Sequence, residues 1–477
     1  MGSTISFILD GTLRNIDFAS ARDGSPTTTV LNYLRSLSDH KGVKEGCAEG
    51  DCGACTVVLA ELHTGNSLRY KAIDSCLMFL PMLHRKQLIT VENLKDSKGI
   101  LHPVQQAMVD SYGSQCGFCT PGIVMAMFSL YKNVNHPSRE QIDDALTGNL
   151  CRCTGYRPIV EAAAAACVHE SSDHFMQHEA DVIRQLKSID RGSIDIRTEF
   201  QHYRKPATLS EAVSVLHHEP NALVICGATD IALRVTKRHD LLSDILDLSD
   251  VEELKECAAT ESALVVGAGL PLEEVREKIH REFPALDQML SVFGSKQIRN
   301  VATLGGNLGT ASPIGDMIPV LMAYRARVLL ESINGRREIP LDQFISGYRK
   351  TVRRPDELMT KIILPKLKNG ALVKSYKISK RKDLDISTVS GGFRLELNNR
   401  NEVREVVLAY GGMAETVKRA RHAEDFLAGK QWTREIVDHA MHLVSESFTP
   451  ISDARAGAHM RSLAAENLLM KFWSETV

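Results

Sequence analysis

Cysteine is the residue type whose spacing in this chain most strongly suggests chemistry. The 477 residues include 11 cysteines, and eight of them lie in the first third of the chain. Cys47, Cys52 and Cys55 follow a C-x4-C-x2-C spacing, and Cys76 comes after twenty further residues. Four thiolates spaced in this way are typical of a plant-type [2Fe–2S] cluster.

The glycines within this first cysteine group fit the same chemistry. Gly46, Gly50 and Gly53 give the loop access to conformations that a Cβ forbids, so backbone N–H groups can approach the sulfurs of an anionic cluster. A structural zinc site is the alternative, but such sites usually take their ligands from two short C-x2-C knuckles. Three cysteines on one loop with a distant fourth favour iron and sulfur.

A second group of four cysteines lies among predicted helices rather than on a glycine-rich loop. It consists of Cys116 and Cys119, followed by the closely spaced pair Cys151 and Cys153. Two of the helices expected here begin just after a cysteine pair, and their free N–H groups and positive dipole ends would suit a negatively charged cluster. A C-x-C pair is also too short for a usual zinc knuckle. The expected helices cover residues 103–112, 121–132, 138–148 and 158–168, and Ser138 with Gln141 forms a capping box for the third.

The other three cysteines are not expected to do chemistry, and the overall composition argues against binding to nucleic acid or membranes. Cys167, Cys226 and Cys257 lie outside both groups and are expected to be small packing residues. The chain has 57 basic and 59 acidic residues, a net charge of −2, so no affinity for nucleic acid or anionic lipid is expected. No run of 18 apolar residues is present, and no transmembrane helix is predicted.

The amino terminus predicts a cytoplasmic protein. It carries no secretory signal pattern. Gly2 and Ser6 formally fit a myristoylation pattern, but residues 4–9 are better explained as a strand that turns at Asp10-Gly11. Cytoplasmic thiols stay reduced, which again favours metal chemistry over disulfides.

Residues 169–197 are polar and are predicted to form a linker. His169, His174 and His178 lie in this stretch, but their irregular spacing favours a linker over a metal site. Beyond it, strands and helices alternate. Val266–Leu272 begins like a dinucleotide fingerprint, but leucine occupies the third glycine position, so a turn is expected there.

Two glycine-containing segments follow the linker. Gly227 and the pair Gly305-Gly306 would let backbone N–H groups approach phosphates closely. Side chains that could bind ribityl, phosphate or ribose groups are Thr229, Thr303, Asn307 and Asp316. On these residues alone, ordinary turns remain the simpler interpretation.

Three long motifs in the first part resemble the iron–sulfur region of the xanthine dehydrogenase (molybdenum hydroxylase) family. They span residues 47–55 (CAEGDCGAC), 115–122 (QCGFCTPG) and 148–156 (GNLCRCTGY). The resemblance implies two [2Fe–2S] clusters, one in a ferredoxin-like domain and one in a helical domain. The ligands it implies are Cys47, Cys52, Cys55, Cys76, Cys116, Cys119, Cys151 and Cys153.

The second part resembles the flavin domain of the same family, which binds FAD without a Rossmann fold. The chain departs from the family at Ala228, where asparagine or glycine is frequent, and at Asp230, where some relatives have glutamate. The resemblance also places Tyr348 and the basic run 380–382 beside a nicotinamide-nucleotide site, with Leu384 where some relatives have an acidic residue. The FAD contacts it implies are Val224, Ile225, Cys226, Gly227, Ala228, Thr229, Asp230, Ile231, Phe293, Thr303, Leu304, Gly305, Gly306, Asn307, Asp316, Met359 and Lys377.

We therefore expect a multidomain α+β fold. The predicted parts are a β-grasp, ferredoxin-like [2Fe–2S] domain (1–88), a four-helix [2Fe–2S] domain (89–168), the linker (169–197), a two-part non-Rossmann FAD-binding α+β domain (198–368) and a small C-terminal α/β flavoprotein domain (369–477).

The resemblance implies an oxidoreductase subunit that transfers electrons and has no catalytic acid or base of its own. Electrons from hypoxanthine or xanthine would come from a molybdenum cofactor on a large partner subunit, pass through the two clusters to FAD, and reduce NAD+. A dimer of two-subunit units is expected, without nucleic acid or membrane. The alternatives are the equivalent subunit of a related hydroxylase for another aromatic or aldehyde substrate, and a non-enzymatic iron–sulfur redox sensor that lacks flavin.

Overall fold

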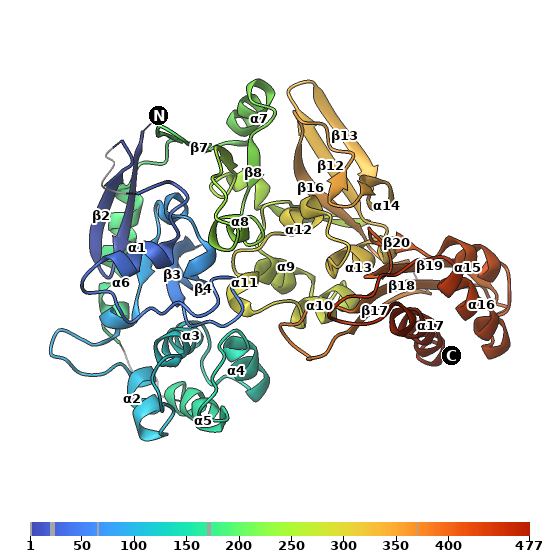
Figure 1. The fold of residues 1–477 in the computed structure, drawn as a ribbon, viewed down its shortest axis with the longest axis horizontal. Helices are drawn as coiled ribbons and strands as arrows, with labels where there is room; N and C mark the ends of the chain where they lie inside the picture. Colours follow the sequence, from blue (N-terminus) through green and yellow to red (C-terminus); the bar gives the residue numbers. More distant parts are fainter. Residues whose placement is uncertain (1, 20–23, 64–65, 169–172, 369) are drawn as a thin grey trace. The chain divides into compact units, whose positions relative to one another are not determined.

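The chain divides into two compact units, which are described separately below. The computed structural model describes residues 2–19, 24–63, 66–168, 173–368 and 370–477. Unit 1 comprises residues 1–208, 221–250 and 295–302, and unit 2 comprises residues 209–220, 251–294 and 303–477. Figure 1 shows the elements of both, coloured along the sequence. All eight cysteines of the two groups belong to unit 1.

Unit 1 begins with a five-stranded mixed sheet in the order β2-β1-β5-β3-β4. β1 pairs in parallel with β5, and the other neighbours are antiparallel. α1 (Val30–Ser36) begins after Thr29, whose side chain accepts a hydrogen bond from the Asn32 N–H. This arrangement is the predicted β-grasp fold. The strands are β1 (Thr4–Leu9), β2 (Thr12–Asp17), β3 (Thr56–His63), β4 (Ser67–Asp74) and β5 (Gln87–Ile89), with short 3-10 helices at Ser75–Leu77, Leu80–Leu83 and Val91–Leu94.

Four helices follow the sheet, as predicted. The central one, α3, is apolar on nearly all sides because it packs against β3 and β4 as well as its neighbouring helices. The capping box of Ser138 and Gln141 opens α4, as the sequence indicated. His102 caps α2, which the sequence analysis did not anticipate. The bounds are α2 (Pro103–Asp110), α3 (Thr120–Asn133), α4 (Arg139–Leu146) and α5 (Arg157–Ala166).

The stretch expected as a linker contains a 15-residue helix, α6 (His174–Ser188). Its polar composition hid an apolar stripe that includes Phe175, Val182 and Leu186, all buried. Asp173 caps the helix by accepting a hydrogen bond from the Met176 N–H, and the same buried carboxylate bonds to His102 and Lys132. Burial disfavours the Asp173 anion, but the bonds to these partners dominate and hold its pKa at about 2.

The rest of unit 1 is a four-stranded sheet in the order β6-β7-β9-β8. β7, β9 and β8 run parallel, and β6 joins β7 antiparallel. The elements are β6 (Ile194–Arg197), β7 (His202–Lys205), β8 (Leu223–Ile225), β9 (Asp244–Asp247), α8 (Ala232–Thr236) and α11 (Lys296–Arg299).

Unit 2 contains two larger sheets and a small hairpin. The five-stranded sheet has the order β10-β11-β16-β12-β13, and the four-stranded sheet has the order β17-β18-β19-β20. The strands are β10 (Cys257–Ala259), β11 (Ala263–Gly267), β12 (Arg327–Ser332), β13 (Gly335–Pro340), β14 (Ile345–Gly347), β15 (Lys350–Thr351), β16 (Leu358–Pro365), β17 (Ala371–Ile378), β18 (Val389–Leu397), β19 (Val403–Gly411) and β20 (Lys418–Arg419).

Helices cover these sheets. α13 packs against β18 and β19, where a Cβ on Gly392 would overlap the backbone of Pro319. The Leu270 N–H bonds to the Gly267 carbonyl, so the segment that resembled a dinucleotide fingerprint is the predicted turn. The helices are α7 (Leu209–His218), α9 (Leu272–Ile279), α10 (Pro284–Ser291), α12 (Leu304–Thr310), α13 (Met317–Ala323), α14 (Leu341–Phe344), α15 (Arg421–Leu427), α16 (Arg434–Glu446) and α17 (Ala458–Ser474).

A buried histidine predicts a pH dependence of the stability of the first sheet. His40 Nε2 lies 3.0 Å from Asp10 Oδ2, and its Nδ1 lies 2.9 Å from Asp39 Oδ1. The hydrogen bond to Asp10, helped by the one to Asp39, raises the pKa of His40 to about 9 despite burial. An unfolded histidine titrates near ~6.5, so the stabilisation is complete below that pH and is lost as the pH rises toward ~9.

We expect the thermal unfolding midpoint to fall between these two pH values more steeply in the wild type than in the variant His40→Gln. Parallel pH profiles for the two proteins would contradict this assignment.

Candidate functional site

The first cysteine loop holds Cys47 and Cys52 against each other. The Cys47 sulfur accepts hydrogen bonds from the backbone N–H groups of Glu49, Asp51 and Cys52, at 3.3–3.4 Å. The thiol of Cys52 also donates to this sulfur, and these donors together lower the pKa of Cys47 to about 5. A sulfur stabilised as an anion by backbone donors is in the state that binds a metal.

Cys55 and Cys76 form a second, buried pair beside the first. Their mutual hydrogen bond and their burial raise the pKa of Cys55 well above its usual range. Asp74 lies next to them, with one carboxylate oxygen 3.8 Å from the Cys55 sulfur. Burial raises the pKa of Asp74 well above its usual range. Asp74 could not be predicted from the sequence, because an isolated aspartate belongs to no motif.

The glycines of this loop are required by its shape. Gly50 and Gly53 adopt left-handed backbone conformations, with φ of +76° and +66°. A Cβ on Gly46 would lie 2.8 Å from the Cys52 sulfur. The loop therefore wraps the cysteines as the sequence predicted.

The second cysteine group is also arranged in pairs. Cys116 bonds to Cys153, and Cys119 bonds to Cys151. The backbone N–H of Phe118 and the Cys153 thiol lower the pKa of Cys116, whereas burial and the bond to Cys151 raise the pKa of Cys119 to about 12. Cys116 and Cys153 are exposed, so this group opens onto the surface.

Within each group, the cysteine thiols interact with one another as two pairs. In a [2Fe–2S] cluster the protein supplies two ligands to each iron, whereas structural zinc takes four ligands around one ion. Among the described residues, no group of three or more His, Cys, Asp or Glu side chains could hold a single metal ion. Pairing of the thiols is compatible with the two ligands per iron that a [2Fe–2S] cluster requires.

The two cysteine groups lie next to each other within unit 1. The Leu150 N–H donates to the Cys52 carbonyl at 3.0 Å, and Leu150 directly precedes Cys151. The Asn149 side chain donates to the Gly53 carbonyl at 2.9 Å and to Thr56 at 3.1 Å. Three hydrogen bonds thus connect the segment before Cys151 to the first cysteine loop.

The residues expected to contact FAD fall in both units. In unit 1, residues 224–231 lead from β8 toward α8, and a Cβ on Gly227 would overlap the Val301 carbonyl. Ala228 has a φ of +57°, a left-handed conformation that asparagine and glycine adopt more readily. The departure at Ala228 therefore carries a backbone cost, which explains why asparagine or glycine would suit this position.

In unit 2, the Thr303–Asn307 segment forms the start of α12. The Thr303 side chain caps the helix by accepting from the Gly306 N–H at 3.0 Å. A Cβ on Gly305 would lie 2.6 Å from the Ala268 carbonyl oxygen. The Asn307 Oδ1 is buried and lacks a hydrogen-bond partner among the described residues. Met359 lies on β16, against which α12 packs.

A buried ion pair joins two more of the expected FAD residues. Lys377 Nζ lies 2.9 Å from Asp316 Oδ2 and donates to the carbonyl of Val292, the neighbour of Phe293, at 3.1 Å. The Ser387 hydroxyl completes the cluster by donating to Asp316 at 2.6 Å. Ser387 was not predicted, because its role depends on pairing across the fold.

The residues expected beside a nicotinamide nucleotide are largely at the surface of unit 2. Tyr348 lies between β14 and β15 and is exposed. In the basic run, Lys380 donates to the Ala454 carbonyl and Arg381 lies 3.8 Å from Asp385. Leu384 has a φ of +59°.

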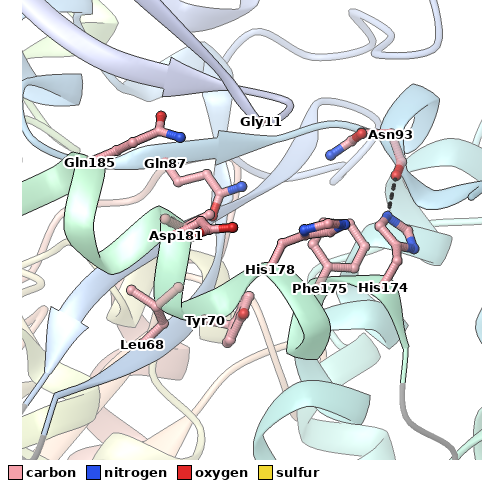
Figure 2. Close-up of a pocket in the computed structure, with 11 residues that line it drawn as sticks. Gly11, Leu68, Tyr70, Gln87, Asn93, His174, Phe175, His178, Asp181 and Gln185 are labelled. Carbon is pink, nitrogen blue, oxygen red and sulfur yellow. Dashed lines mark hydrogen bonds between the residues drawn. The ribbon is translucent and has the colours of Figure 1, made fainter. Parts of the chain in front are cut away.

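Two of the three linker histidines, His174 and His178, line a pocket. Figure 2 shows His174 and His178 on α6 among the residues that line a pocket of about 310 Å³, together with Tyr70 and Gln87. His174 Nε2 bonds to the Asn93 carbonyl at 3.2 Å. His169 lies outside the described residues.

None of the helices in the described ranges combines the length and apolar character that a membrane span needs.

Three family models match the chain. Residues 90–164 match a [2Fe-2S] binding domain, residues 198–367 match the FAD binding domain in molybdopterin dehydrogenase, and residues 374–476 match the CO dehydrogenase flavoprotein C-terminal domain.

Curated relatives include xanthine dehydrogenases. Xanthine dehydrogenase/oxidase from Gallus gallus is 32% identical over 496 residues, covering 89% of this chain and 36% of that protein. Xanthine dehydrogenase from Emericella nidulans is 33% identical over 487 residues, covering 90% of this chain and 35% of that protein. The chain thus spans little more than a third of the length of these relatives.

Solved structures of similar fold are matched over nearly their whole length. A chain of carbon monoxide dehydrogenase from Hydrogenophaga pseudoflava matches with a TM-score of 0.54 and 25% identity, covering 58% of this chain and 96% of that chain. A chain of quinoline 2-oxidoreductase from Pseudomonas putida 86 has the same fold, with a TM-score of 0.53, 24% identity and coverage of 58% and 97%.

The matches to a [2Fe-2S] binding domain and an FAD binding domain define an iron–sulfur flavoprotein. More specifically, the matches show that this chain carries the [2Fe-2S], FAD-binding and C-terminal flavoprotein domains of the molybdenum hydroxylase family. The predicted resemblance and the predicted multidomain α+β fold are confirmed.

Proposed function

We propose that the chain holds two [2Fe–2S] clusters and one FAD and transfers electrons to NAD+ from a molybdenum centre on a larger partner subunit. The single observation that carries the proposal is that the eight free cysteines lie in two neighbouring groups, connected by the hydrogen bond from the Leu150 N–H to the Cys52 carbonyl. The proposed ligands are Cys47, Cys52, Cys55 and Cys76 for one cluster, and Cys116, Cys119, Cys151 and Cys153 for the other.

The chain's own residues bind and position the cofactors. Backbone N–H groups stabilise the negative charge on Cys47, and the Leu150 bond to Cys52 keeps the two cysteine groups adjacent. FAD, when bound, exchanges electron pairs with nicotinamide and single electrons with iron–sulfur centres. In unit 2, the buried Asn307 Oδ1, which lacks a hydrogen-bond partner among the described residues, and the close backbone at Gly305 fit a site built for such a ligand.

The surface around the second cysteine group fits a partner subunit. Tyr112 is 85% exposed and Phe118 is 48% exposed, and they flank Cys116 in the sequence. Leu150 and Tyr156 are also exposed and flank the cysteines that pair with this segment. Exposed apolar groups beside accessible thiols indicate a contact surface. We propose that the molybdenum subunit docks here, in a dimer of two-subunit units in the cytoplasm.

The variant Tyr112→Glu is expected to weaken the complex with the molybdenum subunit about tenfold or more, because it places a charge in an apolar interface. Co-purification from cells that express both subunits measures the effect. Phe200→Glu is the matched control, since Phe200 is an exposed aromatic residue outside this surface. Equal loss of partner in both variants, or in neither, would refute the proposed docking surface.

Xanthine or hypoxanthine is the proposed substrate of the complex, on the basis of the identity to xanthine dehydrogenases. The test is xanthine-dependent NAD+ reduction by the chain co-purified with its partner. An equivalent subunit for another aromatic or aldehyde substrate is the second candidate, which the fold shared with quinoline 2-oxidoreductase favours. Turnover of quinoline-type substrates without turnover of xanthine would select that candidate.

The non-enzymatic redox sensor makes a different prediction. It requires no flavin, whereas the proposal requires one FAD per chain. Flavin released by heating the purified full-length chain, quantified by absorbance, distinguishes the two. The FAD domain match over residues 198–367 supports a flavin.

A further inference from the structure

A short buried segment of unit 1 contacts residues close in sequence to both cysteine groups. This segment, residues 295–302, contains α11 and directly precedes Thr303 in the sequence. Gln297 and Arg299 are almost completely inaccessible to solvent, and Asn300 is 94% buried. Buried polar side chains are usually paired, so their partners indicate what they do.

The partners of these side chains lie on both cysteine-bearing parts of unit 1. Gln297 Nε2 donates to Asn149 Oδ1 at 2.8 Å, and Arg299 lies 2.6 Å from Asp144 on α4. On the side of the first group, Asn300 donates to the Ala72 carbonyl of β4 at 2.8 Å. The segment thus holds the second group through Asn149 and Asp144, and the first through β4.

Asn149 is the residue through which Gln297 acts. Its carboxamide accepts from Gln297 and donates to Gly53 and Thr56 of the first group. Because the Gln297 donor fixes which end of the Asn149 amide faces inward, it keeps the Asn149 donors directed at the first cysteine loop. The backbones approach closely here, since a Cβ on Gly148 would overlap Gln297 and a Cβ on Gly53 would overlap Gly148.

Burial of Gln297 carries a free-energy cost, which its contact with Asn149 explains. Its Oε1 is buried without a hydrogen-bond partner among the described residues, and a buried unpaired acceptor is normally destabilising. The side chain therefore serves the contact with Asn149 rather than optimal pairing of its own amide.

We propose that Gln297 is a positioning residue that, through Asn149, fixes the distance and orientation between the two iron–sulfur clusters. This inference rests on the proposed function, in which both cysteine groups hold clusters. Loss of the Gln297 donor leaves Asn149 Oδ1 buried and unpaired, and the loop of residues 147–151 shifts relative to the first cysteine loop.

The test is low-temperature EPR of the full-length chain reduced by dithionite. Two reduced clusters interact magnetically, and the splitting of their signals depends on their distance and mutual orientation. In Gln297→Leu, we expect unchanged iron and FAD content and unchanged g values of each cluster, but an altered splitting. Gln288→Leu, the same change at an exposed glutamine of α10, is expected to leave the splitting unchanged.

Two further variants guard against failure of Gln297→Leu to fold. Gln297→Asn keeps the amide but withdraws it from Asn149, and Gln297→Glu keeps the length but removes the obligatory donor; both are expected to alter the splitting. If every folded Gln297 variant keeps the wild-type splitting, the positioning role of Gln297 is refuted, and the proposed function is unaffected. Absence of two cluster signals in the wild type would instead refute the proposed function.

Discussion

Replacing Cys116 by serine is expected to remove one of the two clusters while the other cluster and the flavin remain. Cys116 forms its pair with Cys153 at the exposed end of the second group, so its loss leaves one iron with a single cysteine ligand. The first group has its own four cysteines and is unaffected. Iron per chain should fall from about four to about two, since each [2Fe–2S] cluster contains two irons.

The functional consequence of Cys116→Ser follows from the proposed electron order. Reduction of the flavin through the molybdenum subunit should stop, whereas direct oxidation of NADH by the flavin with an artificial acceptor should continue. Cys257→Ser is the matched control, because Cys257 lies on β10 in unit 2, outside both groups. If a folded Cys116→Ser protein loses NADH oxidation as well, the proposed order of electron transfer is wrong.

The substitution Gly53→Ala is expected to have the second large effect. Gly53 has a φ of +66°, and a Cβ there would overlap the Gly148 carbonyl and lie 2.5 Å from the Asn149 side chain. Left-handed strain costs about 1–2 kcal/mol, and forced displacement of closely packed groups adds about 1–3 kcal/mol. We expect a lower unfolding midpoint and loss of iron from both groups, because Gly53 contacts both loops.

The variant Gly99→Ala is the control that separates the strain of a left-handed backbone from steric overlap of the new Cβ. Gly99 has a φ of +79°, but nothing lies within 4 Å of the position of its Cβ. This variant should lose only about 1–2 kcal/mol, the cost of the left-handed conformation, and keep its iron. Equal destabilisation of the two variants would show that the close approach of the two loops does not constrain Gly53.

Local signals explain what could be predicted from the sequence. The strand at Thr4–Leu9 was found from alternation and its turn at Asp10-Gly11. The helix Arg139–Leu146 was found from its capping box. The cysteine spacing indicated the two groups because metal ligands on one loop leave a pattern within a few residues. α6 was missed because its polar face dominates the composition of the stretch.

The residues that could not be predicted depend on contacts between distant parts of the sequence. Gln297 and Asn149 are 148 positions apart, and Ser387 and Asp316 are 71 positions apart. No spacing rule connects such residues, since the contact exists only after folding. The pairing of the cysteines is similar, because the spacing of Cys116 and Cys119 to Cys151 and Cys153 does not show which thiols meet.

The central claim is that this one chain holds two [2Fe–2S] clusters and FAD. The most direct measurement is quantitative EPR of the dithionite-reduced full-length chain, combined with analysis of iron, zinc and flavin in the same sample. We expect two distinct [2Fe–2S] signals, each integrating to about one spin per chain, with one FAD. Zinc in place of iron, or a single cluster signal in a fully loaded and folded protein, would contradict it.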